Sequence, residues 1–397
     1  MGLTADYLQD VADQLVPLHA QLEEDILTDV ARRIAKAGRI TETAAWQARK
    51  MQEAGIVRRS AIRKAAKMTG QTTKTLMHVF DTACTKAIDA DDEIYQAAGL
   101  KLVPLSADQS FRQIMLAGIQ KTQGLFNNLT MTSLNSAGSI YTATMDRAYM
   151  QVISGAFSFD DALKRAITSL ARDGITQLTY ESGAVSSADA AARRSLLTGL
   201  NQTTAQLQLH RAEQLGSDLV EVTAHLGARP THAVWQGGIY SLTGNNRHYR
   251  NFYDETGYGT GEGLCGWNCY HNFFPFFEGL SGRTFTENTH TIKGKTNDQV
   301  YEESQRQRAL ERAVRASKRE IMVLDAARKE AESAELKEYL DREFRRASLT
   351  LRNRRDRLDG FLEETGRRMD QTRIFTPDFS MSTSSKAVWA ARRAAGQ

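Results

Sequence analysis

Residues 225–279 read HLGARPTHAVWQGGIYSLTGNNRHYRNFYDETGYGTGEGLCGWNCYHNFFPFFEG. This stretch contains two of the three cysteines and two of the four tryptophans of the chain. Glycines recur through its middle, which is typical of turns, and aromatic residues crowd its end. The sequence on both sides instead has the periodicity of helices. We therefore expect a small, turn-rich module between two helical regions.

Three short runs in and before this stretch predict strands. Residues 219–225 alternate apolar and polar side chains, with Glu221 and His225 on the polar side. Such alternation predicts a strand with one buried and one solvated face. Residues 239–242 form a second candidate strand, and the β-branched and aromatic run at 175–180 forms a third.

A short helical turn is expected after the candidate strand at residues 219–225. Pro230 suits the first position of a helix, where its missing N–H costs nothing. His232 and Trp235 are three residues apart, so they face the same way on a helical turn.

Residues 1–174 have the apolar spacing of helices. Near the start, an apolar residue recurs every four positions, at Leu18, Leu22, Ile26, Val30 and Ile34. Ser106 and Ser158 each begin a pattern typical of a capping box. Gly174 suits the end of the helix that Ser158 begins. We expect this whole region to be helical.

The chain from Asn297 to Met369 contains no proline and only two glycines, so it also predicts helix. Its apolar residues form a narrow stripe, typical of a coiled coil or a helical hairpin. An unbroken helix of this length would exceed about 100 Å, so it needs a partner or must fold back on itself. The stripe consists of Leu310, Val314, Ile321, Leu324, Leu336, Leu340, Phe344, Ala347, Leu351, Leu358 and Leu362.

The predicted fold class is therefore mainly α, with a small α+β module that contains the Cys/His residues and a long C-terminal helix or helical hairpin. In chain order we expect a helical N-terminal domain at 1–174 and the α+β module at 175–292. A long charged helical or coiled-coil region follows at 293–370. The Ser/Thr-, Ala- and Arg-rich residues 371–397 are expected to be a flexible tail.

The cysteines and histidines of the module suit a structural zinc site. Cys265 and Cys269 are separated by three residues, a spacing common among zinc thiolates, and His232 with either His225 or His271 would complete a tetrahedron. A metal would help so small and loop-rich a module to fold. The alternative is a buried core of thiols and hydrogen-bonded imidazoles with no metal, and a disulfide between the two cysteines is a lesser alternative.

The sequence supports an enzymatic role of the module less than it supports a zinc site. Cys265 or Cys269 with His232 as base would suit nucleophilic catalysis, but no known protease signature surrounds them. The zinc-deaminase pattern fails at both its histidine and its cysteine motif. The glycine-rich residues 257–263 are not followed by the Lys-Ser/Thr of a phosphate loop.

Charge neither demands nor excludes a nucleic-acid partner, because the net charge is only +4. One part of the C-terminal region is strongly basic. Its arginines suit contact with DNA phosphates, and a solvated helix face beside many glutamates is the alternative. These candidate nucleic-acid residues are Arg345, Arg346, Arg352, Arg354, Arg355 and Arg357.

The sequence also carries expectations about its compartment. Three cysteines in 397 residues are not a disulfide framework, so synthesis in the cytoplasm is the simpler interpretation. The N-terminus lacks the basic and apolar regions of a signal peptide. No apolar run reaches the length of a membrane span, so no membrane association is expected.

An ordered set of motifs resembles the tailed-phage minor capsid protein 2 family and, more loosely, the head-morphogenesis module of Mu F-like proteins. The resemblance is strong over about residues 175–280. Its motifs are Tyr180–Gly183, Thr198–Thr203, His225, Ala228–His232, Trp235–Gly237, Gly263–His271 and Pro275–Gly279. The family position between Cys269 and His271 is often basic, whereas this chain has Tyr270.

The resemblance implies a minor virion protein that acts with the portal protein, the major capsid protein or both in head assembly and in DNA packaging or delivery. It implies several copies per particle, at the capsid interior or portal vertex, after synthesis in the host cytoplasm. It supplies no catalytic residues, and an enzyme carried in the virion and a DNA-binding head protein are the alternatives. The motif positions transfer as candidate structural or binding residues: His225, Arg229, His232, Trp235, Cys265, Trp267, Asn268, Cys269 and His271.

Overall fold

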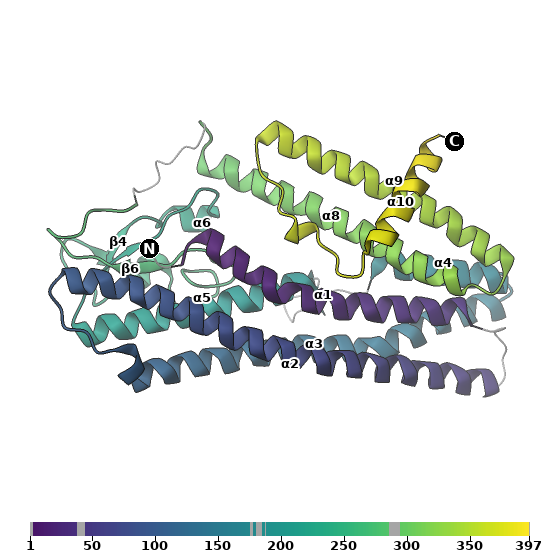
Figure 1. Cartoon of the computed structure of the whole chain (residues 1–397), viewed down its shortest axis with the longest axis horizontal. Coiled ribbons are helices and arrows are strands. Elements are labelled where there is room, and N and C mark those ends of the chain that lie inside the picture. The colour runs from purple at the N-terminus through teal and green to yellow at the C-terminus, as the bar shows by residue number, and fades with distance from the viewer. Residues whose placement is uncertain are drawn as a thin grey trace. The chain divides into compact units, whose positions relative to one another are not determined.

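A computed structural model describes residues 3–37, 44–174, 178–179, 185–186, 188–285 and 294–396. Over these residues the fold is mainly α with a small sheet, which confirms the predicted fold class (Figure 1). Among them, no helix combines the length and the apolar composition that a membrane span requires.

The longer helices before the sheet are α1 (Ala5–Ala35), α2 (Ala44–Ala97), α3 (Gln109–Ile153), α4 (Phe159–Asp173) and α5 (Ala188–Leu215). The later helices are α6 (Pro230–Ala233), α7 (Phe252–Thr256), α8 (Asn297–Glu330), α9 (Ala334–Thr365) and α10 (Met381–Ala395). Two short 3₁₀ turns are η1 (Leu105–Ala107) and η2 (Thr372–Ile374). The strands are β1 (Leu178–Thr179), β2 (Val185–Ser186), β3 (Leu219–Val222), β4 (Ile239–Ser241), β5 (Arg250–Asn251) and β6 (Phe273–Pro275).

The chain packs into two compact units, and each unit collects three separate stretches of sequence. The sheet unit comprises residues 1–16, 71–127 and 192–305, and the hairpin unit comprises residues 17–70, 128–191 and 306–397. Helices α1, α2, α3, α5 and α8 therefore contribute residues to both units. The sequence predicted domains that follow one another along the chain, with boundaries at residues 174, 292 and 370. The two packed units are grouped differently, and the division into consecutive domains stays a prediction.

In the hairpin unit, the C-terminal region folds back on itself. The helix breaks after Glu330, and the hydroxyl of Ser333 caps α9 by accepting a hydrogen bond from the Leu336 N–H. The guanidinium of Arg328 on α8 bonds to the Asp341 carboxylate at 3.0 Å and lies 3.9 Å from the centre of the Phe344 ring on α9. Figure 1 shows α9 running back beside α8, so the hairpin is the alternative that the structure takes.

The apolar stripe predicted for this region forms the inner face of the hairpin. From Val314 to Leu362, each stripe residue is buried, and Leu310 is partly buried against the same core. That core also receives residues of α1, α2, α3 and α4. On α2 and α3, the rings of Trp46 and Tyr149 stack with their centroids 5.1 Å apart.

The segment expected to be a flexible tail instead contains η2 and α10. The hydroxyl of Ser380 caps α10 by accepting a bond from the Thr383 N–H. Ala387 and Ala390 are buried in the hairpin core, because α10 packs against α9. A serine- and alanine-rich composition thus suits a capped helix with a small-residue face here.

In the sheet unit, four strands have the order β5-β4-β3-β6. β3 pairs antiparallel with β4 and β6, whereas β5 joins β4 in parallel. The expected half-buried strand at 219–225 is shorter, and it is buried along its whole length. Glu221 is fully buried, and its carboxylate is satisfied there by hydrogen bonds that it accepts from the backbone N–H groups of Thr284 and Phe285. The prediction of a solvated face was therefore wrong, since a later segment covers it.

Of the two serines predicted to cap helices, Ser158 does so and Ser106 does not. Ser158 caps α4, and Gly174 ends it with φ at 71°. Ser106 lies in η1 instead, and the Asp108 carboxylate begins α3 by accepting a bond from the Phe111 N–H at 3.0 Å. Of the strand expected at 175–180, only β1 falls within the described residues.

Candidate metal centre

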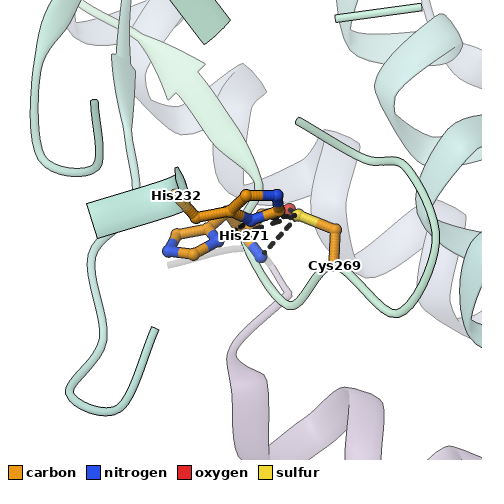
Figure 2. A group of neighbouring side chains, drawn as sticks. All are labelled: His232, Cys269 and His271. Atoms are coloured by element: carbon orange, nitrogen blue, oxygen red, sulfur yellow. Dashed lines mark hydrogen bonds between the residues drawn. The ribbon is translucent and has the colours of Figure 1, made fainter. Parts of the chain in front are cut away.

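Three side chains of the sheet unit converge on one point (Figure 2). His232 comes from α6, and Cys269 and His271 come from the loop that leads into β6. The two imidazole Nδ1 atoms are 3.4 Å apart, and the Cys269 Sγ lies 3.7 Å from each of them. All three residues are buried, with exposed fractions of 2%, 2% and 1%. Within the described residues, these three form a group whose ligand atoms would suit a metal ion.

The local sequence holds both sides of this group in place. Pro230 occupies the first turn of α6, as predicted, and His232 and Trp235 share a face with ring centroids 4.6 Å apart. The loop before β6 is tightly wound, with Cys265 and Asn268 in the left-handed region at φ 59° and 52°. Gly266 permits this winding, because a Cβ there would lie 2.4 Å from the carbonyl oxygen of Gly261.

Helix α5 anchors the same loop. The Asn201 side-chain amide donates hydrogen bonds to the carbonyl oxygens of Cys269 at 3.1 Å and His271 at 2.9 Å. Its oxygen accepts a bond from the Asn272 amide at 3.3 Å. Asn201 is completely buried, so these bonds satisfy an otherwise costly polar group. The sequence placed Asn201 in a motif of the resemblance but indicated no role for it.

The second nitrogen of each converging imidazole also has a partner. His232 Nε2 lies 2.8 Å from the carbonyl oxygen of Glu262, and His271 Nε2 lies 3.0 Å from Oε1 of Gln236. That same Oε1 accepts the backbone N–H of His225 at 3.1 Å. The sequence placed Gln236 in a motif of the resemblance but indicated no role for it. It gave no signal for Glu262, because only its backbone carbonyl takes part.

Burial decides the protonation of these groups. It lowers the pKa of His232 to about 4 and lowers the pKa of His271 well below its ordinary value. It raises the pKa of the Cys269 thiol to about 11, and the pKa of the Cys265 thiol is also raised, again chiefly by burial. Both imidazoles are therefore neutral near pH 7, and both free thiols are protonated.

Two predicted ligands lie beside the group and not in it. Cys265 is buried, and its Sγ lies 3.8 Å from the carbonyl oxygen of His271. The His225 ring stacks on the His271 ring with centroids 4.4 Å apart, and its Nδ1 lies 3.2 Å from the carbonyl oxygen of Leu226. Of the two histidines left open by the sequence, the structure thus brings His271 into the group.

The remaining motif residues have varied surroundings. The Arg229 guanidinium donates to the carbonyl oxygen of Trp267 at 2.6 Å, which ties α6 to the cysteine loop. Trp235 is buried, with its ring centroid 4.9 Å from that of His271. Trp267 and Asn268 are exposed. Tyr180–Gly183, another motif of the resemblance, lies outside the described residues.

The six arginines proposed for nucleic-acid contact lie on α9 in the hairpin unit. Arg354 is turned inward and donates to the Ala313 carbonyl oxygen at 2.9 Å and the Ser317 hydroxyl at 2.7 Å. At 3.6 residues per turn, Arg346 and Arg357 lie about 120° around the helix from Arg345 and Arg352. The arginines therefore flank the hairpin on two sides and do not form one patch.

A nucleophilic role suits these cysteines poorly. A reactive cysteine is normally a partly exposed thiolate with a lowered pKa. Cys265 and Cys269 are 1% and 2% exposed, and burial shifts both pKa values upward. The local chemistry favours a ligand or a core thiol over a nucleophile.

Comparison with known proteins agrees with the resemblance noted in the sequence. A segment of 174 residues is 25% identical to a protein of Lactococcus phage LL-H described as "Structural protein". The match covers 41% of this chain and 47% of that protein, so the chain spans about half the length of this relative. No solved structure matches the chain significantly. The model of the family described as phage minor capsid protein 2 matches residues 3–363, which include most of both compact units. The chain therefore belongs to the phage minor capsid protein 2 family.

Proposed function

We propose that this protein is a minor component of the phage head that sits at the portal vertex or the capsid interior. There it acts in head assembly and in DNA packaging or delivery. The observation that carries the proposal is the family match over residues 3–363, since the family is one of capsid proteins. Membership supports a structural role in the virion, and the place within the head is the finer step proposed here.

The proposed partners are the portal protein, the major capsid protein or both, and the protein is expected in several copies per particle. Mass spectrometry of purified particles should detect the chain at a fixed ratio to the portal protein. A deletion of its gene should leave heads that are empty, misassembled or not infectious, and complementation with the wild-type gene should restore them. Infectious, DNA-filled heads that lack the protein would refute this role.

The position in the head has its own test. A tagged copy of the chain that still supports infection can be located in a particle map by its label. Density at the portal ring or on the inner capsid surface is expected. Label only on the outer capsid or the tail would contradict the proposed position.

Contact with packaged DNA is a second candidate, favoured by exposed arginines on α9. Arg352, Arg355 and Arg357 are exposed, and among the described residues their one ion-pair partner is Asp356, 3.9 Å from Arg352. DNA affinity should fall steeply with salt because bound arginines release counterions. Replacing these three arginines with Gln should flatten the salt slope by about one unit for each phosphate that is no longer bound.

A matched control for this test lies on the same helix. Arg342 is exposed but ion-paired with Glu338 at 2.6 Å, so Arg342→Gln should change the slope little. Comparing the pair Arg346 and Arg357 with the pair Arg345 and Arg352 identifies which flank of the hairpin meets DNA. Absence of measurable binding at low salt would end this candidate.

A further inference from the structure

We propose that His232 Nδ1, Cys269 Sγ and His271 Nδ1 bind one zinc ion in the sheet unit. This inference goes beyond the proposed function and does not depend on where the protein sits in the head. It rests on four features of the group, namely its distances, the fixed tautomers of its histidines, the bonds to its sulfur and its position between elements.

The distances match those of a zinc tetrahedron. Zinc binds imidazole nitrogen at about 2.0–2.1 Å and thiolate sulfur at about 2.3 Å. At tetrahedral angles these lengths place two nitrogens about 3.3–3.4 Å apart and a nitrogen and a sulfur about 3.5–3.6 Å apart. The observed separations are 3.4 Å between the nitrogens and 3.7 Å from each nitrogen to the sulfur. One ion fits between the three atoms without rearrangement of the backbone.

The tautomers of the two histidines leave their Nδ1 lone pairs facing each other. A carbonyl oxygen can only accept, so His232 Nε2 must donate to Glu262 O. The backbone N–H of His225 fixes the Gln236 Oε1 as an acceptor, so His271 Nε2 must donate as well. Both Nδ1 atoms are then acceptors at 3.4 Å, and the single Cys269 proton can serve only one of them. A bound cation satisfies both.

These bonds are also the ones that metal-binding histidines make. A ligating imidazole commonly donates its other N–H to a carbonyl or carboxylate, which fixes the ring orientation. Both histidines of the group donate to a carbonyl oxygen in this way. The Cys269 Sγ accepts the backbone N–H of His271 at 3.4 Å, a bond that favours thiolate over thiol. The hydrogen bonds that would orient all three ligands are thus already made.

The ion would join two segments that are far apart in the chain. His232 lies on α6, whereas Cys269 and His271 lie on the loop into β6, which Asn201 holds from α5. Among the described residues this group supplies three ligands to the tetrahedron. Cys265 stays outside the set in this arrangement and packs in the buried cluster with Phe252 and Phe273.

The test uses the full-length protein. Elemental analysis of protein purified without added chelator should find about one zinc per chain, the stoichiometry of a single site. After chelation, added Co²⁺ should give the intense visible absorption of a tetrahedral site with a thiolate ligand. X-ray absorption of the zinc form should show one sulfur and nitrogen or oxygen ligands. Wild-type protein that retains no zinc and takes up neither zinc nor cobalt would overturn the proposal.

Variants separate the ligand set from general damage to the fold. Cys269→Ser, His232→Gln and His271→Gln should each lose the bound zinc. Cys265→Ser is the matched control, since it alters an equally buried thiol in the same loop, and it should keep the zinc. An equal loss in Cys265→Ser, or two sulfurs in the absorption spectrum, would contradict the three-residue set. If a ligand variant fails to fold by circular dichroism, the cobalt spectrum and sulfur count of the wild type still decide.

Discussion

Single polar side chains hold the group of His232, Cys269 and His271 in place. The Gln236 Oε1 accepts hydrogen bonds from the His225 backbone and from His271, so one buried amide orients two neighbouring groups. The cysteines and histidines could be picked out from the sequence because their spacing is common among zinc ligands. The spacing left His225 and His271 open, because the choice depends on how the loop winds through left-handed backbone at Cys265 and Asn268. No glycine marks that turn at Cys265, where such a conformation is uncommon.

Replacing Gln236 with Leu should weaken the sheet unit. His225 N–H and His271 Nε2 would both lose their buried acceptor, and one unmet buried group costs about 1–3 kcal/mol. Urea unfolding followed by tryptophan fluorescence should show a lower midpoint than in the wild type. Gln236→Glu, which keeps an acceptor oxygen, is the control. A midpoint unchanged in Gln236→Leu would mean that this amide does not hold the centre.

Glu24 makes the hairpin unit sensitive to pH. Burial raises the pKa of its carboxyl from 4.5 to about 8, partly offset by the Asp378 N–H that it accepts. The folded state therefore holds the proton more tightly than the unfolded state, and this contribution to stability is full below about pH 4.5. This contribution is lost as the pH rises toward 8. Its size is about 1.4 kcal/mol for each unit by which the pKa of Glu24 in the folded state exceeds that in the unfolded state.

Glu24→Gln should remove this dependence, because an amide keeps the shape and an acceptor oxygen but does not titrate. The difference in unfolding free energy, variant minus wild type, should increase from about pH 5 to about pH 8. Thermal or urea unfolding at several pH values measures it. A difference that stays constant over this range would show that Glu24 ionises normally in the folded protein.

At the scale of elements, the helices were predictable, and the places where they end were less so. A proline-free apolar stripe indicated helix from Asn297 to Met369, and its stripe residues are indeed buried or partly buried. The reversal after Glu330 has no glycine or proline to mark it, and only the Ser333 cap indicates a new start. The prediction of a solvated face on β3 was wrong for a different reason. The backbone groups that bond to Glu221 belong to Thr284 and Phe285, which follow it by 63 and 64 residues.

Ser333→Ala should destabilise the start of α9. The change removes the bond from the Leu336 N–H and also the contact of the hydroxyl with the Asp160 carboxylate at 2.9 Å. Loss of such a cap typically costs about 1 kcal/mol. Hydrogen exchange at the first turn of α9 should become faster, with a small fall in the unfolding midpoint. Thr350→Ala, in the middle of the same helix, is the control and should leave exchange at that turn unchanged.

At the scale of the whole molecule, the two units are interleaved along the sequence. Each unit collects three stretches, so a division in chain order cannot reveal which residues pack together. Local patterns report helix and strand, but the grouping depends on contacts between distant segments. The hairpin core shows this, since α1 residues such as Ile26 pack in the same cluster as Leu340.

A stop codon after Gln305 should therefore damage more than the region it removes. Residues 17–70 and 128–191 would lose the α8, α9 and α10 surfaces that complete their core. The truncated protein should aggregate, or be cleaved by protease within those residues at low concentration. A chain that ends at residue 370 should be less affected, since it keeps α8 and α9. A soluble, protease-resistant chain ending at 305 would contradict the grouping.

Because the two units are interleaved along the sequence, each can finish folding only late in translation. The sheet unit needs residues up to 305, and the hairpin unit needs α10, close to the end of the chain. Neither core can close while the ribosome is in the first half of the message. At about 5–20 residues per second, the nascent chain carries long helices without their final partners for on the order of ten seconds or more. We therefore expect a chaperone that shields the growing chain to raise the yield of folded protein.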